Sequence, residues 1–155
     1  MKYRQLSKEQ FESLHKEFAQ FLATQKIDVK EWEIIKVKKP SLVEEELNVY
    51  SDLVWEDVLH KVQYLEHFSK KSLNLFECGK TVIKRIVITI HSDIDLFTEE
   101  GYRWLLHHPK DASVTYLTGE KKYTPERNTE LFSLIEKGSI ITEGRLFKFF
   151  DGLIT

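Results

Sequence analysis

The sequence is poor in cysteine, proline and glycine. Cys78 is the one cysteine, so an internal disulfide and a zinc site with several thiolates are both excluded. A chain without disulfides suits a reducing compartment, and we therefore expect a cytoplasmic protein. With three prolines and six glycines among 155 residues, the chain is neither collagen-like nor proline-rich, and we find no low-complexity segment or internal repeat.

The sequence also lacks a long hydrophobic run. Its longest β-branched apolar stretch, residues 86–90, is far shorter than the roughly 20 residues that a membrane-spanning helix needs. The first seven residues are polar from the start and do not resemble a secretory signal. We therefore expect no membrane association and interpret residues 86–90 as a strand.

Charge of one sign is not in excess. The 23 Lys and Arg residues nearly balance the 25 Asp and Glu residues, which gives a formal net charge of -2 and a pI of about 6.3. A dedicated nucleic-acid-binding protein has a basic excess, so we do not expect nucleic acid as the main partner. Hydrophobic residues make up 41% and charged residues 31% of the chain, as in globular proteins, and the length predicts a single domain over residues 1–155.

The common catalytic signatures are absent. The chain has no Gly-rich phosphate loop, no Gly-x-Ser-x-Gly turn, no His-Glu-x-x-His motif and no Cys-x-x-Cys pair. Ser13 and Lys16 match the Ser-x-x-Lys spacing of some acyl enzymes, but a chain with this many serines and lysines contains about one such match by chance. We predict no catalytic residues and no cofactor, and we favour a protein that is not an enzyme.

The N-terminal third is predicted to be helical. Ser7, with a glutamine three residues later, has the form of a capping box, and apolar residues recur at helical spacing over residues 7–26. Asp28 is a suitable N-cap for a second, short helix that ends at Pro40.

A third helix is predicted from residue 41 to about residue 68. Its apolar stripe consists of Leu47, Tyr50, Val54, Val58, Val62 and Leu65. A restart at residues 51–52 would divide it into two helices, and the pattern leaves both arrangements open.

After residue 70 the apolar period changes from about 3.6 to 2. The pattern predicts a hairpin with strands at residues 73–76 and 81–91, and it places Ile86, Ile88 and Ile90 together on a core face. Residues 114–117 are the predicted third strand, added as an antiparallel neighbour. The prediction is an α+β fold with a small antiparallel sheet of about three strands.

Three more helices are predicted after the hairpin. The first spans residues 99–108 after an N-cap at Thr98, and the second begins with Pro125 in its first turn and ends at Gly138. The last begins near Thr142. The N-terminal and C-terminal helices are expected to pack with the sheet around one core.

One group of residues predicts a metal site. Glu56 and His60 are four residues apart on a predicted helix, so both can bind one ion, and His91, Asp93 and Asp95 form the richest remaining donor cluster. The alternative is a solvated pair on the helix and turn-forming aspartates after the strand. A metal-binding protein or metal-dependent enzyme that uses Glu56, His60, His91 and Asp93 is therefore an alternative function.

A second group of residues is basic and surrounds the predicted hairpin. It consists of Lys70, Lys71, Lys80, Lys84 and Arg85. These residues could contact phosphates, with Phe76 stacking on a base if its ring is exposed. We favour the simpler explanation that lysines protect strand edges from pairing, and keep weak nucleic-acid binding as a second alternative.

Aromatic residues make up 12% of the chain, more than a core of this size needs. Trp104 and Phe147 lie off the main apolar stripes of their helices, so they are the predicted interface residues. Binding a protein partner or forming a homodimer would cover them. The alternative is that both rings widen the buried face.

Five segments are spread over nearly the whole chain: residues 1–4 (MKYR), 21–25 (FLATQ), 51–56 (SDLVWE), 64–69 (YLEHFS) and 146–150 (LFKFF). Together they resemble an uncharacterised family of small bacterial proteins, a domain of unknown function of about 150 residues. The resemblance implies a free-standing bacterial protein and no particular activity. The main functional prediction is therefore a non-enzymatic intracellular protein-interaction module.

Overall fold

The computed structural model describes all 155 residues and divides the chain into two compact units. Met1–His60 form the first, which we call the helical unit, and Lys61–Thr155 form the second, the sheet unit. None of the helices is both long enough and apolar enough to span a membrane. That residues 1–155 behave as a single domain stays a prediction.

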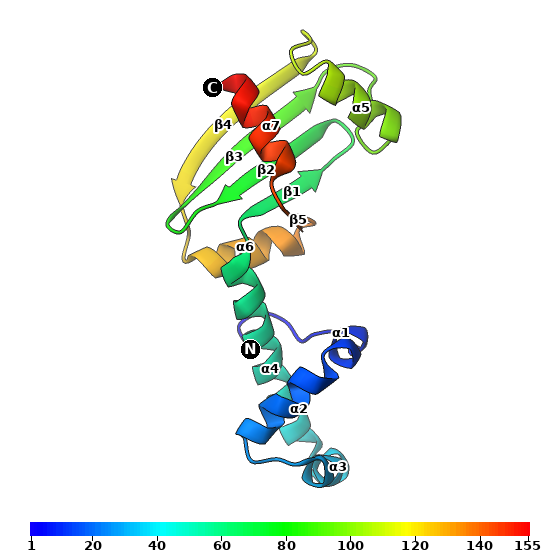
Figure 1. The fold of residues 1–155 in the computed structure, drawn as a ribbon, viewed down its shortest axis with the longest axis vertical. Coiled ribbons are helices and arrows are strands. Elements are labelled where there is room, and N and C mark those ends of the chain that lie inside the picture. Colours follow the sequence, from blue (N-terminus) through cyan, green and yellow to red (C-terminus); the bar gives the residue numbers. More distant parts are fainter. The chain divides into compact units, whose positions relative to one another are not determined.

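The helical unit contains three short helices and most of a long one (Figure 1). They are α1 (Lys8–Ser13), α2 (His15–Thr24), α3 (Val29–Lys38) and α4 (Pro40–Lys61). The predicted capping box is present: the Ser7 hydroxyl accepts the Gln10 N–H at 3.2 Å, and the Gln10 side chain accepts the Ser7 N–H at 2.8 Å. Asp28 caps α3 by accepting the Glu31 N–H at 2.8 Å. Both predicted start signals are confirmed.

The prediction of one helix over residues 7–26 is wrong. Leu14, at φ -108° and ψ 21°, ends α1 and precedes α2. On both sides of this break, rings contact Tyr50 of α4, with centroid distances of 6.2 Å for Phe11, 4.9 Å for Phe18 and 5.3 Å for Phe21. These contacts form the aromatic core of the helical unit.

The long helix α4 continues through residues 51–52 without a break. Ser51 is fully buried, and its hydroxyl donates to the Leu47 carbonyl at 2.7 Å while accepting the Leu6 N–H at 3.0 Å. Ser51 therefore ties the N-terminal segment to α4 and does not begin a new helix. The predicted extension to residue 68 is wrong, because α4 ends at Lys61 and residues 64–68 form a strand.

The sheet unit is built on a five-stranded antiparallel sheet with the order β4-β3-β2-β1-β5. The strands are β1 (Tyr64–Phe68), β2 (Ser72–Cys78), β3 (Val82–Ile90), β4 (Val114–Lys122) and β5 (Ile140–Thr142). The α+β class and the β2–β3 hairpin are confirmed, but the expectation of about three strands is wrong. The helical spacing predicts a helix where β1 lies, and β5 is only three residues long and has no strand signal of its own. β4 was predicted but extends beyond residue 117.

The two faces of the sheet differ in what covers them. The register pairs Ile88 with Leu73 on β2 and with Tyr116 on β4, and all three face the side on which α5 and α7 lie (Figure 1). Ile86 and Ile90 share this side, and the three isoleucines are at most 2% exposed, which confirms the predicted core face. The opposite face carries the alternate residues and borders α6.

The helices of the sheet unit are α5 (Glu99–His107), α6 (Arg127–Glu136) and α7 (Arg145–Ile154). Thr98 caps α5 as predicted, since its hydroxyl accepts the Gly101 N–H at 3.0 Å. The predicted start of a helix at Pro125 is wrong, because α6 begins two residues later. The last helix begins after Gly144, because residues 140–142 pair with β1 instead.

Candidate functional site

The first pair of predicted metal ligands, Glu56 and His60, lies on α4. Glu56 already binds two side chains of the helical unit: its Oε1 lies 2.8 Å from Lys2 Nζ and accepts a short hydrogen bond from the Tyr3 hydroxyl. Burial and this hydrogen bond raise the pKa of Tyr3 to about 12, so Tyr3 remains a donor at neutral pH. A metal ion bound through Oε1 of Glu56 would therefore have to displace Lys2 and Tyr3.

The second pair, His91 and Asp93, directly follows β3 in the sheet unit. His91 Nε2 lies 3.0 Å from Thr115 Oγ1 on β4, and the Asp93 side chain is exposed in the loop. Nowhere in the chain do three or more His, Cys, Asp or Glu side chains form a group that could hold a metal ion. The site formed by Glu56, His60, His91 and Asp93 stays a prediction.

The basic residues around the hairpin do not form one surface. Lys84 and Arg85 are neighbours on β3 and point to opposite faces of the sheet. Lys71 Nζ donates to two backbone carbonyls of the β3–α5 loop at 2.6 and 2.8 Å. Phe76 is 6% exposed, with the Arg85 guanidinium 5.5 Å from its ring centroid, so it offers no ring to a base. Edge protection does not explain these lysines either, because β2 and β3 are central strands.

Of the two predicted interface residues, Phe147 belongs to the core. It is 4% exposed, and its ring centroid lies 5.8 Å from that of Tyr64 on β1. The expectation that Phe147 points away from the apolar stripe of its helix is wrong, and the ring instead widens the buried face. The exposed aromatic residue of α7 is Phe149, which is 42% exposed.

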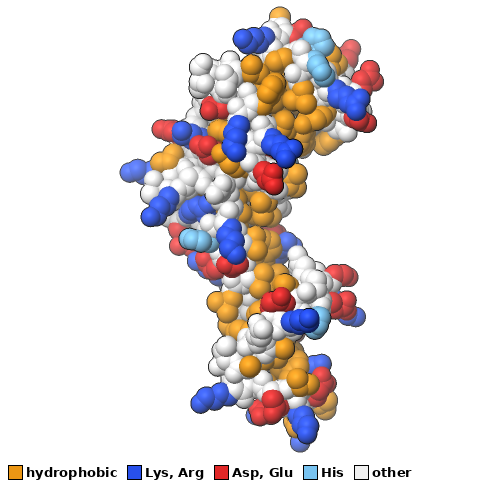
Figure 2. All heavy atoms as spheres, in the orientation of Figure 1, with side chains coloured by type: hydrophobic (Ala, Val, Ile, Leu, Met, Phe, Trp, Pro, Cys, Tyr) orange, Lys and Arg blue, Asp and Glu red, His pale blue; other side chains and the backbone are white.

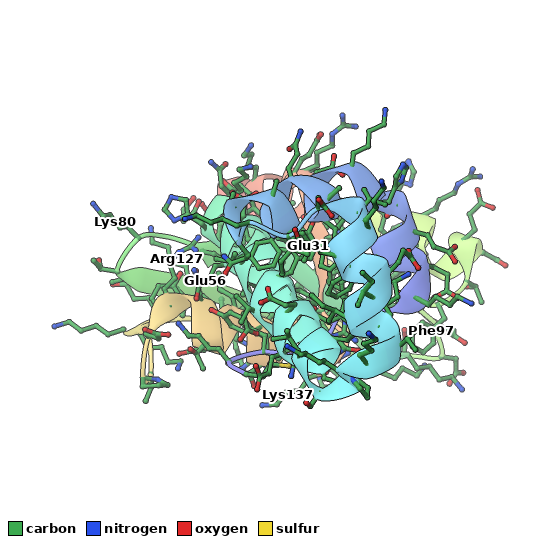
Figure 3. All side chains as sticks on the ribbon, turned by 90° about the horizontal axis from the view of Figure 1, so that it is seen from below. Glu31, Glu56, Lys80, Phe97, Arg127 and Lys137 are labelled. Carbon is green, nitrogen blue, oxygen red and sulfur yellow. The ribbon has the colours of Figure 1, made fainter.

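Hydrophobic side chains gather over α7 and α5 on the surface of the sheet unit (Figure 2). On α7, Phe149 is the exposed ring, and on α5 Trp104 is half-buried with its ring stacked on His108 at a centroid distance of 5.0 Å. The other half-buried side chains are Leu106, Leu146, Leu153 and Ile154. We call these residues, with Phe149 and Trp104, the α5–α7 surface. Phe97, just before α5, is 67% exposed and points away from the sheet unit in Figure 3.

The opposite face of the sheet is hollowed beside α6 by a cavity of about 630 Å³. Its lining includes apolar side chains of β3 and β4 and the guanidinium of Arg85, whose Nε donates to Asn74 Oδ1 at 3.0 Å. At the α6 wall, Glu130 binds Lys121 Nζ at 2.7 Å. The cavity therefore combines an apolar floor with the positioned guanidinium of Arg85 and the Glu130–Lys121 ion pair, and its polar lining also includes Lys137, Glu120 and His67.

Two structural features of the sheet unit are not predicted by the sequence patterns. Arg127, in the first turn of α6, donates to the carbonyl oxygens of Val62, Cys78 and Gly79, and Figure 3 shows it near the turn that carries Lys80. No spacing rule indicates such a contact between distant segments. The other feature is β4, an edge strand exposed over its second half, whose length exceeded the predicted strand.

Comparison with known proteins identifies the family but no activity. No curated protein and no solved structure matches the chain. A family described as "Family of unknown function (DUF6495)" matches residues 1–155, which is the full length. The resemblance to an uncharacterised family is thereby confirmed, and the chain belongs to this family of unknown function.

Proposed function

We propose that the protein is a non-enzymatic interaction module of the bacterial cytoplasm and binds a protein partner through the α5–α7 surface. The observation that supports this proposal is Phe149, a large aromatic side chain that is 42% exposed although the same helix buries two other phenylalanines. Aromatic side chains in contiguous apolar areas are typical of binding hot spots. The core residues of α7 fix the helix, so Phe149 is presented by a rigid element.

The half-buried Trp104 suits the same role. Its ring is stacked on His108 with an interplanar angle of 19°, so it loses little conformational freedom when a partner covers it. The basic side chains of α7 already have partners in the chain: Arg145 lies 3.7 Å from Glu143, and the Lys148 ammonium lies 5.2 Å from the centroid of the Tyr64 ring. We therefore expect a partner that covers the Phe149 and Trp104 rings with an apolar ridge.

The decisive variant is Phe149→Asp. A photo-crosslinking residue at position 152, one helical turn from Phe149 on α7, should capture a partner in cells. Adding Phe149→Asp should abolish that capture while the melting temperature stays near that of the wild type. Val37, which is 82% exposed in the helical unit, is the matched control, and Val37→Asp should retain the partner. If Phe149→Asp recovers the same proteins as the wild type, the proposed surface is wrong.

A further inference from the structure

The outer edge of β4 has backbone hydrogen-bonding groups that face no strand. β4 is the last strand of the sheet, and its neighbour β3 lies on one side only. The His91 N–H donates to the Ser113 carbonyl at 2.7 Å, so these two residues form a hydrogen-bonded pair. In an antiparallel ladder, hydrogen-bonded and non-hydrogen-bonded pairs alternate along the strand. Residues 115, 117, 119 and 121 therefore direct their backbone groups toward β3, whereas residues 116, 118, 120 and 122 direct theirs outward. The Val114 N–H, which also points outward, is used by the Asp111 carbonyl at 3.0 Å.

This edge lacks most of the features that usually block strand pairing. It has no proline over the nine residues of β4, and residues 117–122 are all exposed; the blocking feature that it does have is the charge of Glu120, Lys121 and Lys122. The opposite edge, β5, offers only three residues. Only β4 is long enough to accept another strand over several hydrogen-bonded pairs.

We propose that β4 pairs with β4 of a second copy of this chain, antiparallel and centred on Thr118. This register aligns all nine residues, with Val114 facing Lys122 of the other copy at each end, although the Val114 N–H stays bonded to the Asp111 carbonyl and takes no part in the pairing. It also places outward-directed residues opposite each other, with Thr118 facing Thr118 and Tyr116 facing Glu120. The two five-stranded sheets become one continuous sheet.

The side chains of β4 favour this partner and this direction. Its charged residues, Glu120, Lys121 and Lys122, all lie in the C-terminal half, so the antiparallel register sets each of them opposite an uncharged residue of the other copy. A parallel pairing in register would instead place each charge beside its own kind. A strand of unrelated sequence does not in general have uncharged residues at the three positions opposite these charges.

The side chains at positions 117 and 119 are complementary in size across the proposed pair. Leu117 is 71% exposed, and in the proposed register it faces Gly119 of the other copy. A Cβ atom built on Gly119 meets nothing within 4 Å, so there is space for the leucine beside it. Two such contacts form by symmetry, and each removes the exposed leucine from water.

A pair of cysteine variants tests the register. In a hydrogen-bonded pair the Cα atoms are about 5.5 Å apart, within the range of about 4.4–6.8 Å that a disulfide spans. Thr118→Cys should therefore form a covalent dimer on mild oxidation. Glu120→Cys is the control, because the two residues 120 lie four positions apart along the strands, about 13 Å, and should not be crosslinked. Native Cys78 is buried and its pKa is raised to about 12 by that burial, so it stays unreactive.

Sedimentation velocity tests the association itself. The wild type should shift from 18.4 kDa to twice that mass as its concentration rises. Thr118→Pro removes an outward N–H and no bond to β3, so it should remain monomeric, whereas Thr118→Ala should dimerise like the wild type. A wild type that stays monomeric overturns the proposal. A dimer that Glu120→Cys crosslinks as readily as Thr118→Cys overturns it as well.

Discussion

Truncating Ile88 to alanine tests the core of the sheet unit. Ile88 is fully buried and lies between Leu73 and Tyr116 on the neighbouring strands. The change removes three carbon atoms, which is about 2.4 kcal/mol of transfer free energy at about 0.8 kcal/mol per carbon. If the surrounding side chains do not move, a cavity of about 80 Å³ adds about 2 kcal/mol at about 24 cal/mol per Å³. We therefore expect Ile88→Ala to lower the free energy of unfolding by about 2 to 4 kcal/mol.

Urea denaturation followed by far-UV circular dichroism measures this loss. With a slope of about 2 kcal/mol per molar urea, the midpoint should fall by about 1 to 2 M. Val87→Ala is the matched control, because Val87 is the next residue on β3, points to the opposite face and is only partly buried. Its midpoint should shift by less than half as much. Equal shifts for the two variants would refute the assignment of the two faces.

Three further predictions concern single sites. Burial raises the pKa of Glu66 in the folded protein above its ordinary value of 4.5. Between the unfolded-state pKa and the raised folded-state pKa, the folded protein holds a proton on Glu66 that the unfolded chain has lost. The free energy of unfolding therefore falls as pH rises through that range. Glu66→Gln should remove this slope and raise the melting temperature at neutral pH; an unchanged pH profile would contradict the assignment. Gly144→Ala should destabilise the protein by about 1 to 3 kcal/mol or more, because φ is 81° and the new Cβ would lie 2.4 Å from the Tyr64 ring. Gly152→Ala, with nothing within 4 Å, should not destabilise it. Elemental analysis of the purified protein should find no stoichiometric zinc, iron or manganese, since Glu56 is already engaged by Lys2 and Tyr3; a stoichiometric metal would support the alternative function.

Capping rules correctly predicted the starts of three helices. Ser7, Asp28 and Thr98 each cap a helix as expected, because a cap depends only on the next three residues. The end of α4 could not be found in this way. Val62 and Leu65 continue the helical spacing, yet Leu65 pairs with Phe76 in the sheet and is fully buried there. Residues 64–68 form a strand because they pair with β2 and β5. This long-range pairing cannot be inferred from the local sequence pattern.

The candidate site was predicted less well than the core. Trp104 is half-buried, and its role as an interface residue stays a prediction. Phe147, which was expected to be exposed, is buried, and the exposed ring of α7 is Phe149. The helix starts at Arg145, three residues later than the predicted start near Thr142, and the stripe that faces the sheet includes both Phe147 and Phe150. Which rings are buried depends on where α7 meets the sheet, and that follows from β5 and Gly144 rather than from the spacing of phenylalanines alone.

The two proposed surfaces use different parts of the sheet unit and are compatible with each other. Pairing at β4 uses backbone groups in the plane of the sheet, whereas the α5–α7 surface lies on one of its faces. In an antiparallel pair, residues that face each other across the two strands point to the same side. The two α5–α7 surfaces of a dimer would therefore lie on the same side of one continuous sheet. A partner with two copies of its apolar ridge could then engage both at once, and the second contact would form at a high effective concentration.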